Sequence, residues 1–206
     1  MTIIIKYGLG NVGSIYNMCK YIGSDVMISN SFDEIEKASS LILPGVGSFD
    51  QGMSLLEQNG LKQLLHFKVI EQKVPVLGIC LGMQLMTKGS EEGNLPGLNW
   101  IDAKCIKFKF DKNDKTLRIP HMGWNDIYVK KTESMLFPMI DDELQFYFAH
   151  SYHIVCNTDI IMATTRYGYE FPVAFKKDNI LGVQFHPEKS HQFGMNFLKA
   201  FTNNQY

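Results

Sequence analysis

Cys80 is the residue whose surroundings most clearly suggest chemistry. It lies in the segment GICLGMQL at residues 78–85, after the hydrophobic run VPVL and before a helical pattern. Gly78 and Gly82 stand two residues before and after it, which is the nucleophile-elbow pattern with sulfur in place of oxygen. A sharp strand-to-helix turn strains the nucleophile and leaves little space for side chains at those two positions. The segment therefore predicts a reactive cysteine, with a buried core thiol as the alternative.

A cysteine nucleophile needs a base, and the base needs a group that orients it. His186 follows the strand-like segment ILGVQF, and Pro187 and Glu188 come next. Residues two apart in an extended segment point to the same side, so Glu188 can support the imidazole of His186. Taken alone, His-Pro-Glu is equally compatible with a surface turn. Together with Cys80 it predicts a Cys-His-Glu triad.

Backbone N–H groups near Cys80 can stabilise an oxyanion. The N–H of Leu81 follows the nucleophile at the start of the predicted helix, whose positive end also favours thiolate over thiol. A second donor can come from the loop Gly45-Val46-Gly47, which follows the apolar run LILP in the same predicted sheet. Glycine lets the backbone of such a loop approach a ligand closely. A plain turn is the alternative.

A second glycine pattern, at residues 8–13, fits G-x-G-x-x-G and follows a strand. The next predicted strand ends without the acidic residue that would hold a ribose, so a tight turn is favoured over a dinucleotide site. Of the other histidines, His66 is expected to lie on the surface and His191 to open the last helix. His121, His150 and His153 are expected to make structural hydrogen bonds. No spacing indicates zinc, so neither a metal nor a cofactor is predicted.

The elements that must position these residues alternate between strand and helix over the first half of the chain. Near-continuous apolar strands at residues 2–7, 39–43 and 74–80 predict a parallel α/β sheet covered on both faces. From about residue 96 to 185 several strands alternate, including 103–110, 127–131, 144–156, 160–168, 173–178 and 180–185, which predicts an antiparallel extension. Turns are expected at Lys112-Asn113-Asp114 and Asp178-Asn179. A helix is expected over residues 81–89, and the helical pattern of residues 50–73 is expected to break near Asn59-Gly60. A helix closes the chain, and we expect one domain over residues 1–206.

Composition limits the possible functions. The chain has 206 residues, 45% of them hydrophobic, and a formal net charge of -1, which argues against broad binding to nucleic acid or anionic membrane. Only three consecutive isoleucines open the chain, too few for a signal-peptide core, and no apolar run could span a bilayer. The four cysteines are scattered without a C-x-x-C pair, so free thiols are expected. A soluble cytoplasmic protein is the expectation.

The segments GICLGMQL, GVQFHPE and LILPGVGSFD resemble those of the class I (triad) glutamine amidotransferases. The segments YGLGN, IPHMGWN, YFAHSY and HPEKS are similar to one branch of that family, the glutaminase subunits of imidazole glycerol phosphate synthase. The resemblance spans nearly the whole chain, although Lys6 stands where that branch usually has an acidic residue. It implies a flavodoxin-like three-layer α/β sandwich around a mostly parallel sheet.

The resemblance also implies site roles. Cys80 would attack the side-chain amide of glutamine, His186 would move the proton, and Glu188 would orient His186. The remaining implied oxyanion and glutamine-binding residues are Gly45, Val46, Gly47, Leu81, Gln84, His150, Ser151 and Tyr152.

The implied partner is a (β/α)8-barrel cyclase subunit, HisF, which would form a heterodimer with the chain and use its ammonia in histidine biosynthesis. The implied interface residues are Asn11, Met122, Trp124 and Lys189. The segments SEEGNLPGLNWIDA, RYGYEFPVAF and HPEKSHQFGMNFL look at least as much like a paralogous branch that supplies ammonia to a sugar amidotransferase in surface-polysaccharide synthesis. A non-catalytic nucleotide-binding module is the third hypothesis.

Overall fold

A computed structural model describes residues 1–111, 116–130, 136–137 and 144–204. An eight-stranded sheet forms its centre, in the order β2-β1-β3-β4-β12-β11-β10-β7. In that order the strands are Val26–Ser29, Thr2–Ile5, Ser40–Gly45, Val76–Cys80, Ile180–Val183, Tyr169–Lys177, Ile161–Tyr167 and Tyr128–Val129. The first five are parallel and the last three continue the sheet antiparallel. The prediction of a mostly parallel sheet with an antiparallel extension is therefore confirmed.

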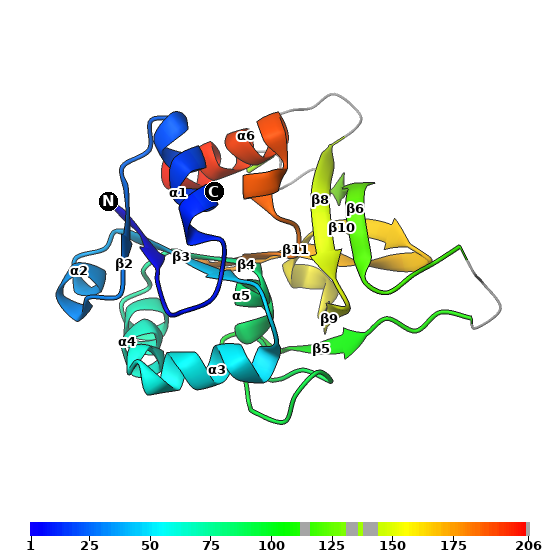
Figure 1. The fold of residues 1–206 in the computed structure, drawn as a ribbon, viewed down its shortest axis with the longest axis horizontal. Coiled ribbons are helices and arrows are strands. Elements are labelled where there is room, and N and C mark those ends of the chain that lie inside the picture. The colour runs from blue at the N-terminus through cyan, green and yellow to red at the C-terminus, as the bar shows by residue number, and fades with distance from the viewer. Residues whose placement is uncertain (112–115, 131–135, 138–143, 205–206) are drawn as a thin grey trace.

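Helices cover both faces of the parallel part, as Figure 1 shows. Helices α1 (Val12–Tyr21) and α6 (His191–Thr202) lie on one face, and α3 (Phe49–Gln58), α4 (Leu61–His66) and α5 (Leu81–Leu85) lie on the other. Alternate residues of β1 serve the two layers, since Ile3 belongs to one apolar cluster and Ile4 to the other. Burial on both faces explains why these strands are almost wholly apolar.

The described residues also contain four short helical segments: α2 at Phe32–Glu36, a π-helical turn at Phe67–Glu71, and 3₁₀ turns at Thr158–Ile160 and Pro187–Lys189. The break predicted at Asn59-Gly60 is confirmed, because Gly60 has φ 67° and separates α3 from α4. Helix α5 is only five residues long, shorter than the predicted helix. The Thr87 hydroxyl donates to the carbonyl of Gln84 at 2.8 Å, which satisfies a carbonyl at the end of that helix.

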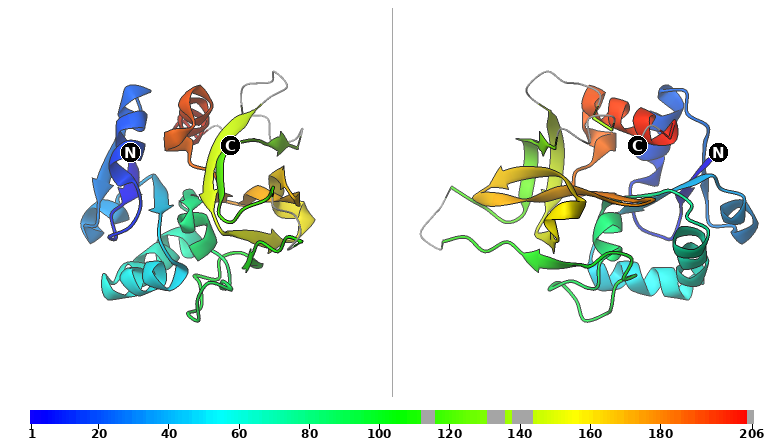
Figure 2. Two further views of the ribbon diagram at one scale, coloured as in Figure 1. Left: turned by 45° about the vertical axis from the view of Figure 1, so that its right-hand side comes forward. Right: turned by 180° about the vertical axis from the view of Figure 1, so that it is seen from behind.

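Two further two-stranded sheets flank the extension. Strand β5 (Ala103–Lys107) pairs with β9 (Tyr152–Cys156), and β6 (His121–Asp126) pairs with β8 (Gln145–His150), all antiparallel. Figure 2 shows these strands beside the antiparallel end of the main sheet. The single strand predicted over 144–156 is wrong, because the chain bends at Ser151 and changes partner there. Strand β6 was not predicted, since it contains the turn-favouring residues of the GWND segment.

The predicted turn at Asp178-Asn179 is confirmed. Asp178 has φ 53°, and the Asn179 side chain donates to the carbonyls of Val69 and Val74, both at 2.9 Å. The turn predicted at residues 112–114 lies outside the described residues, as does the end of the strand predicted at 127–131.

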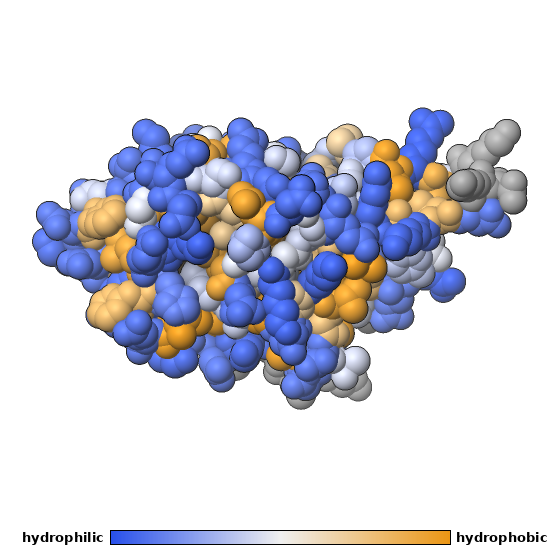
Figure 3. All heavy atoms as spheres, turned by 90° about the horizontal axis from the view of Figure 1, so that it is seen from below, coloured by the Kyte–Doolittle hydropathy of each residue, from blue (hydrophilic) through white to orange (hydrophobic). Residues whose placement is uncertain are grey.

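The surface is mostly hydrophilic on the side drawn in Figure 3, with hydrophobic side chains distributed between the polar ones. Within the described ranges, no helix is long and apolar enough to cross a membrane. All four cysteines are free thiols, and three of them are buried.

Candidate active site

The turn at Cys80 has the strained geometry of a nucleophile elbow. Strand β4 ends at Cys80, whose φ of 53° and ψ of -110° are unusual for a residue with a side chain. A Cβ built on Gly82 would lie 1.8 Å from the carbonyl oxygen of Leu43, and one on Gly78 would lie 2.7 Å from the backbone nitrogen of Met83. Both glycines are therefore required by close backbone packing around the cysteine.

Strand order brings His186 to Cys80. Strand β12 lies directly beside β4, with Val183 opposite Ile79, so the residues that follow both strands meet at one edge of the sheet. The Nδ1 atom of His186 lies 2.9 Å from Oε1 of Glu188, and both side chains are almost completely buried. This contact leaves the other ring nitrogen of His186 for the thiol.

The route by which Glu188 reaches His186 differs from the prediction. Residues 187–189 form a 3₁₀ turn and not the expected extended segment. The backbone N–H of Lys189 donates to the His186 carbonyl at 3.0 Å, and the Ser190 hydroxyl donates to the same carbonyl at 2.6 Å. These bonds fold the chain back on itself, so Glu188 turns toward the imidazole.

The environment of His186 favours its charged form. Burial lowers the pKa of His186, but Cys80 and Glu188 together outweigh that effect and raise the pKa to about 10. A protonated imidazole beside a thiol is the arrangement in which a cysteine holds its reactive thiolate form. The second carboxylate oxygen of Glu188, Oε2, is buried without a hydrogen-bond partner among the described residues.

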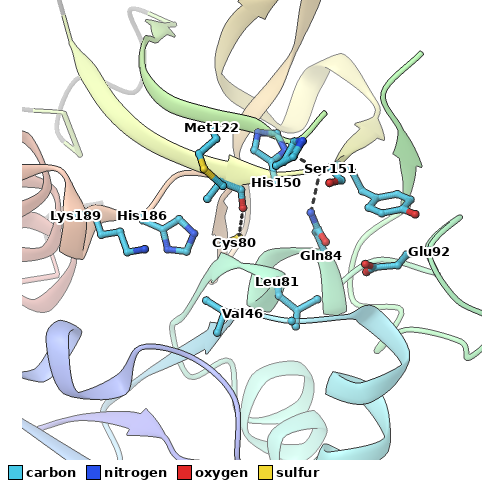
Figure 4. A pocket seen from close by; sticks show the side chains of 14 residues that line it. Val46, Cys80, Leu81, Gln84, Glu92, Met122, His150, Ser151, His186 and Lys189 are labelled. Atoms are coloured by element: carbon cyan, nitrogen blue, oxygen red, sulfur yellow. Dashed lines mark hydrogen bonds between the residues drawn. The ribbon is translucent and has the colours of Figure 1, made fainter. Parts of the chain in front are cut away.

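A pocket of about 330 Å³ opens in front of the cysteine (Figure 4), a size within the range of small-molecule sites. Its lining residues are Val46, Gly47, Cys80, Leu81, Gln84, Glu92, Pro120, Met122, Ala149, His150, Ser151, Tyr152, His186 and Lys189. The structure thus collects most of the predicted site residues, from segments more than one hundred residues apart, around one cavity.

Gly45 is placed differently from the other predicted residues. It is the last residue of β3, is paired with Cys80, and does not line the pocket. A Cβ on Gly45 would lie 2.7 Å from both the backbone nitrogen of Gly82 and Cβ of Leu81. Its observed contribution is to let β3 pack closely against the elbow. Gly47, with φ 111°, lies at the pocket itself.

The 8–13 glycine loop packs against the same region. A Cβ on Gly10 would lie 2.9 Å from Cβ of Pro44, and the Tyr7 hydroxyl donates to the Pro44 carbonyl at 2.8 Å. Gly8 and Gly10 have φ values of 110° and 97°. These glycines therefore allow the loop to lie against the end of β3, in agreement with the interpretation as a tight turn.

Two buried histidines form a directional hydrogen-bond chain that begins at the pocket wall, which His150 lines. The carbonyl of Tyr152 can only accept, so Nδ1 of His150, 2.8 Å away, carries a hydrogen. Nε2 of His150 then accepts from Nδ1 of His121 at 2.9 Å, and Nε2 of His121 accepts from the Asn125 amide at 3.1 Å. Every partner is satisfied with both rings neutral.

Burial agrees with that tautomer assignment, since it lowers the pKa of His121 to about 4 and lowers the pKa of His150 well below its usual value. His153 bonds to the Tyr169 hydroxyl at 2.9 Å. Structural hydrogen bonding was the expectation for these three histidines. His66 is exposed, and His191 is the first residue of α6.

Two residues near Cys80 were not predicted from the sequence as part of the site: Gln184 and Glu92. Gln184 is completely buried, and its amide nitrogen lies 3.6 Å from Sγ of Cys80. The sequence could have indicated Gln184, because it stands two residues before His186 in GVQFHPE. Glu92 lines the pocket and accepts from the backbone N–H of Phe49 at 2.8 Å. No sequence pattern indicated Glu92, because it lies in a loop. In the described part of the chain, no cluster of three or more His, Cys, Asp or Glu side chains could hold a metal ion.

Residues 3–204 match the glutamine amidotransferase class-I family, so the chain belongs to that family of enzymes. Solved structures with the same fold include a crystal structure of a glutamine amidotransferase, with a TM-score of 0.73 and 18% identity over 98% of this chain and 97% of that one. Another is a glutamine amidotransferase from Thermotoga maritima, with a TM-score of 0.60 and 17% identity over 98% of this chain and 82% of that one.

Among proteins with curated names, the chain is similar to imidazole glycerol phosphate synthase subunits HisH. It is 53% identical to subunit HisH 2 of Methanococcus maripaludis, over 98% of both chains. It is 44% identical to subunit HisH 2 of Pseudomonas aeruginosa over 98% of both, and 43% identical to subunit HisH of Bdellovibrio bacteriovorus over 98% and 99%.

Proposed function

We propose that the chain is the glutaminase subunit of an imidazole glycerol phosphate synthase. It would hydrolyse L-glutamine to glutamate and ammonia and pass the ammonia to a cyclase subunit in histidine biosynthesis. The observation that carries this proposal is the strained Cys80 beside the buried His186–Glu188 pair, at the wall of one pocket. Full-length similarity to proteins named HisH supports the choice of substrate and pathway.

In the proposed reaction the Sγ atom of Cys80 attacks the side-chain amide carbon of glutamine. The C=O electrons move onto oxygen to form a tetrahedral oxyanion. His186 first takes the thiol proton and then delivers it to the leaving nitrogen, so the C–N bond breaks and ammonia departs. His186 then activates water, which cleaves the thioester and releases glutamate. Glu188 keeps the imidazole in the orientation that both steps need.

Leu81 and the Val46-Gly47 segment would supply the N–H groups for the oxyanion. Both border the pocket next to Cys80, which supports this assignment. Gly45 would contribute through its close packing against the elbow. The segment 150–152 would bind the glutamine together with Gln84. Because the amide nitrogen of Gln84 donates to Tyr152 and Gln184, its Oε1 is the atom left to accept from the substrate.

The partner would be the (β/α)8-barrel cyclase HisF, in a heterodimer. Met122 and Trp124, two of the implied interface residues, are 63% and 44% exposed on β6. The Trp124 ring is stacked on His191 with centroids 5.3 Å apart, which holds the indole at the surface. Lys189 borders the pocket and lies 5.4 Å from the centre of the Tyr147 ring. A docked partner would therefore meet the pocket as well as β6.

Asn11, the fourth implied interface residue, is partly exposed in the loop before α1.

We also infer that residues 1–206 form one domain, because the family match extends over residues 3–204.

Glutamate release tests the proposal. The chain would be mixed with a cyclase subunit HisF, the acceptor substrate and glutamine, and in parallel with a sugar amidotransferase and its acceptor. We expect the cyclase to stimulate glutamate release, the isolated chain to be nearly inactive, and Cys80→Ala to abolish turnover. A glutamine-shaped affinity label should modify Cys80. Stimulation by the sugar amidotransferase alone would reject the pathway, and full activity of Cys80→Ala would reject the chemistry.

A further inference from the structure

A buried amide that does not line the pocket lies against the sulfur of Cys80. Gln184 follows β12 directly and is completely buried. Its Nε2 atom is 3.6 Å from Sγ of Cys80, and its backbone N–H donates to the Val173 carbonyl at 2.8 Å. A buried polar side chain in such a place costs free energy unless it is hydrogen-bonded, so its partners define what it does.

The orientation of this amide follows from a backbone carbonyl. The Tyr152 carbonyl can only accept, so the group of Gln84 that lies 3.1 Å from it must be the NH₂. The second hydrogen of that NH₂ points to Gln184 at 2.9 Å and therefore meets Oε1. The NH₂ group of Gln184 is consequently turned toward Cys80. The direction of each bond in this chain is set without reference to the sulfur.

The contacts of the sulfur with Ala149 and Gln184 differ in the protonation state of the sulfur that they favour. The Ala149 carbonyl, 4.0 Å from Sγ, can accept a hydrogen from the thiol but offers nothing to a thiolate. The NH₂ group of Gln184 can only donate, and a donated hydrogen bond is stronger when the acceptor carries a charge. Transfer of the thiol proton to His186 therefore weakens the contact with Ala149 and strengthens the one with Gln184.

We propose that Gln184 is a further catalytic residue of this site, which holds Sγ of Cys80 in position and stabilises the thiolate from the buried side. Its own orientation is maintained by Gln84 and the Tyr152 carbonyl. The inference rests on the proposed function, because it concerns the cysteine as nucleophile. The Gln184 amide would give the sulfur a hydrogen-bond donor before glutamine binds, and this donor would remain in place while the thioester forms.

The experiment compares Gln184→Met with wild type. Methionine conserves volume but cannot donate a hydrogen bond. Val183→Ala is the control: Val183 is the neighbour of Gln184 in the chain, is similarly buried, and does not line the pocket. The rate of Cys80 alkylation by iodoacetamide would be followed by mass spectrometry of the peptide that contains it. Glutamate release by the complex with the cyclase would give kcat and KM.

We expect alkylation of Gln184→Met to slow by about 10-fold or more, the loss expected for a hydrogen bond to a charged acceptor. The kcat should fall by a similar factor while KM changes less than kcat, and Val183→Ala should retain both rates. If Gln184→Met does not fold, Gln184→Asn replaces it, since its donor is one carbon too short to reach the sulfur. A folded variant whose alkylation rate and kcat stay within twofold of wild type overturns the proposal.

Failure of this inference is distinguishable from failure of the proposed function. If wild type releases glutamate and Cys80→Ala does not, the glutaminase assignment stands whatever Gln184→Met shows. If Cys80→Ala is as active as wild type, the glutaminase chemistry itself is wrong. Alkylation is measured without glutamine or a partner, so it reports on the sulfur in either case.

Discussion

Replacing Gly82 with alanine should disrupt the elbow. The new Cβ would lie 1.8 Å from the carbonyl oxygen of Leu43, whereas Cβ contacts under 3.0 Å are essentially never observed. The two backbones must therefore separate by at least about 1.2 Å. Leu43 lies on β3 opposite Gly78, so this movement would pull β3 away from β4 just below the nucleophile. No flexible side chain is available to absorb the displacement.

The expected cost follows from that geometry. Overpacking a well-packed interior costs about 1–3 kcal/mol of unfolding free energy, and a clash between two backbones belongs at the upper end. A displacement of about 1 Å at a reacting atom lowers the rate by about 100-fold. We expect Gly82→Ala to lose about 3 kcal/mol in urea unfolding and to lose most glutamate release in the presence of the cyclase.

Gly13→Ala is the matched control. Gly13 also lies in a helix, α1, but a Cβ there would meet no atom within 4 Å. Alanine is a better helix former than glycine, so this variant should gain about 0.5–1 kcal/mol and keep wild-type activity. Equal stability and equal Cys80 alkylation rates for Gly82→Ala and Gly13→Ala would refute the steric explanation of the elbow.

Three other substitutions test the charges and hydrogen bonds around the site. The pKa of His186 is raised to about 10, so the stability from its bound proton is complete below about pH 6.5 and is lost as the pH rises toward 10. Glu188→Gln should reduce that alkaline loss, measured as unfolding free energy at pH 6.5 and 9.5. Burial lowers the pKa of His121 to about 4, so wild type should lose stability as the pH falls from 6.5 toward 4. His121→Phe should lower stability by about 1–2 kcal/mol at pH 7 but reduce the loss in acid. Tyr7→Phe removes the 2.8 Å bond to the Pro44 carbonyl and should cost about 1 kcal/mol in urea unfolding.

The outcomes that contradict these three predictions are specific. An unfolding profile of Glu188→Gln that runs parallel to wild type above pH 7 would show that the carboxylate does not support the proton on His186. A His121→Phe variant with the same acid sensitivity as wild type would assign that sensitivity to other groups. Tyr7→Phe with unchanged stability would mean that the Pro44 carbonyl finds another partner.

The sequence alone determined the local features of this protein. The apolar strands, the break at Gly60 and the glycines on either side of Cys80 follow from side-chain size and periodicity within a few residues. The candidate nucleophile, base and orienting carboxylate were identified from the same short patterns, and the resemblance to glutamine amidotransferases rested on those patterns too. The family match and the fold confirm the resemblance to that family.

Only the tertiary structure decided which distant residues meet. That β12 lies beside β4 brings His186 to Cys80, and the hydrophobic pattern of a strand does not specify its neighbours in a sheet. The same strand order places Gln184 against the sulfur. The bend at Ser151 sends β8 and β9 to different partners, which a continuous alternating pattern from 144 to 156 concealed. Contacts between residues about one hundred positions apart depend on packing of the whole chain, and that packing assembles the pocket around Cys80.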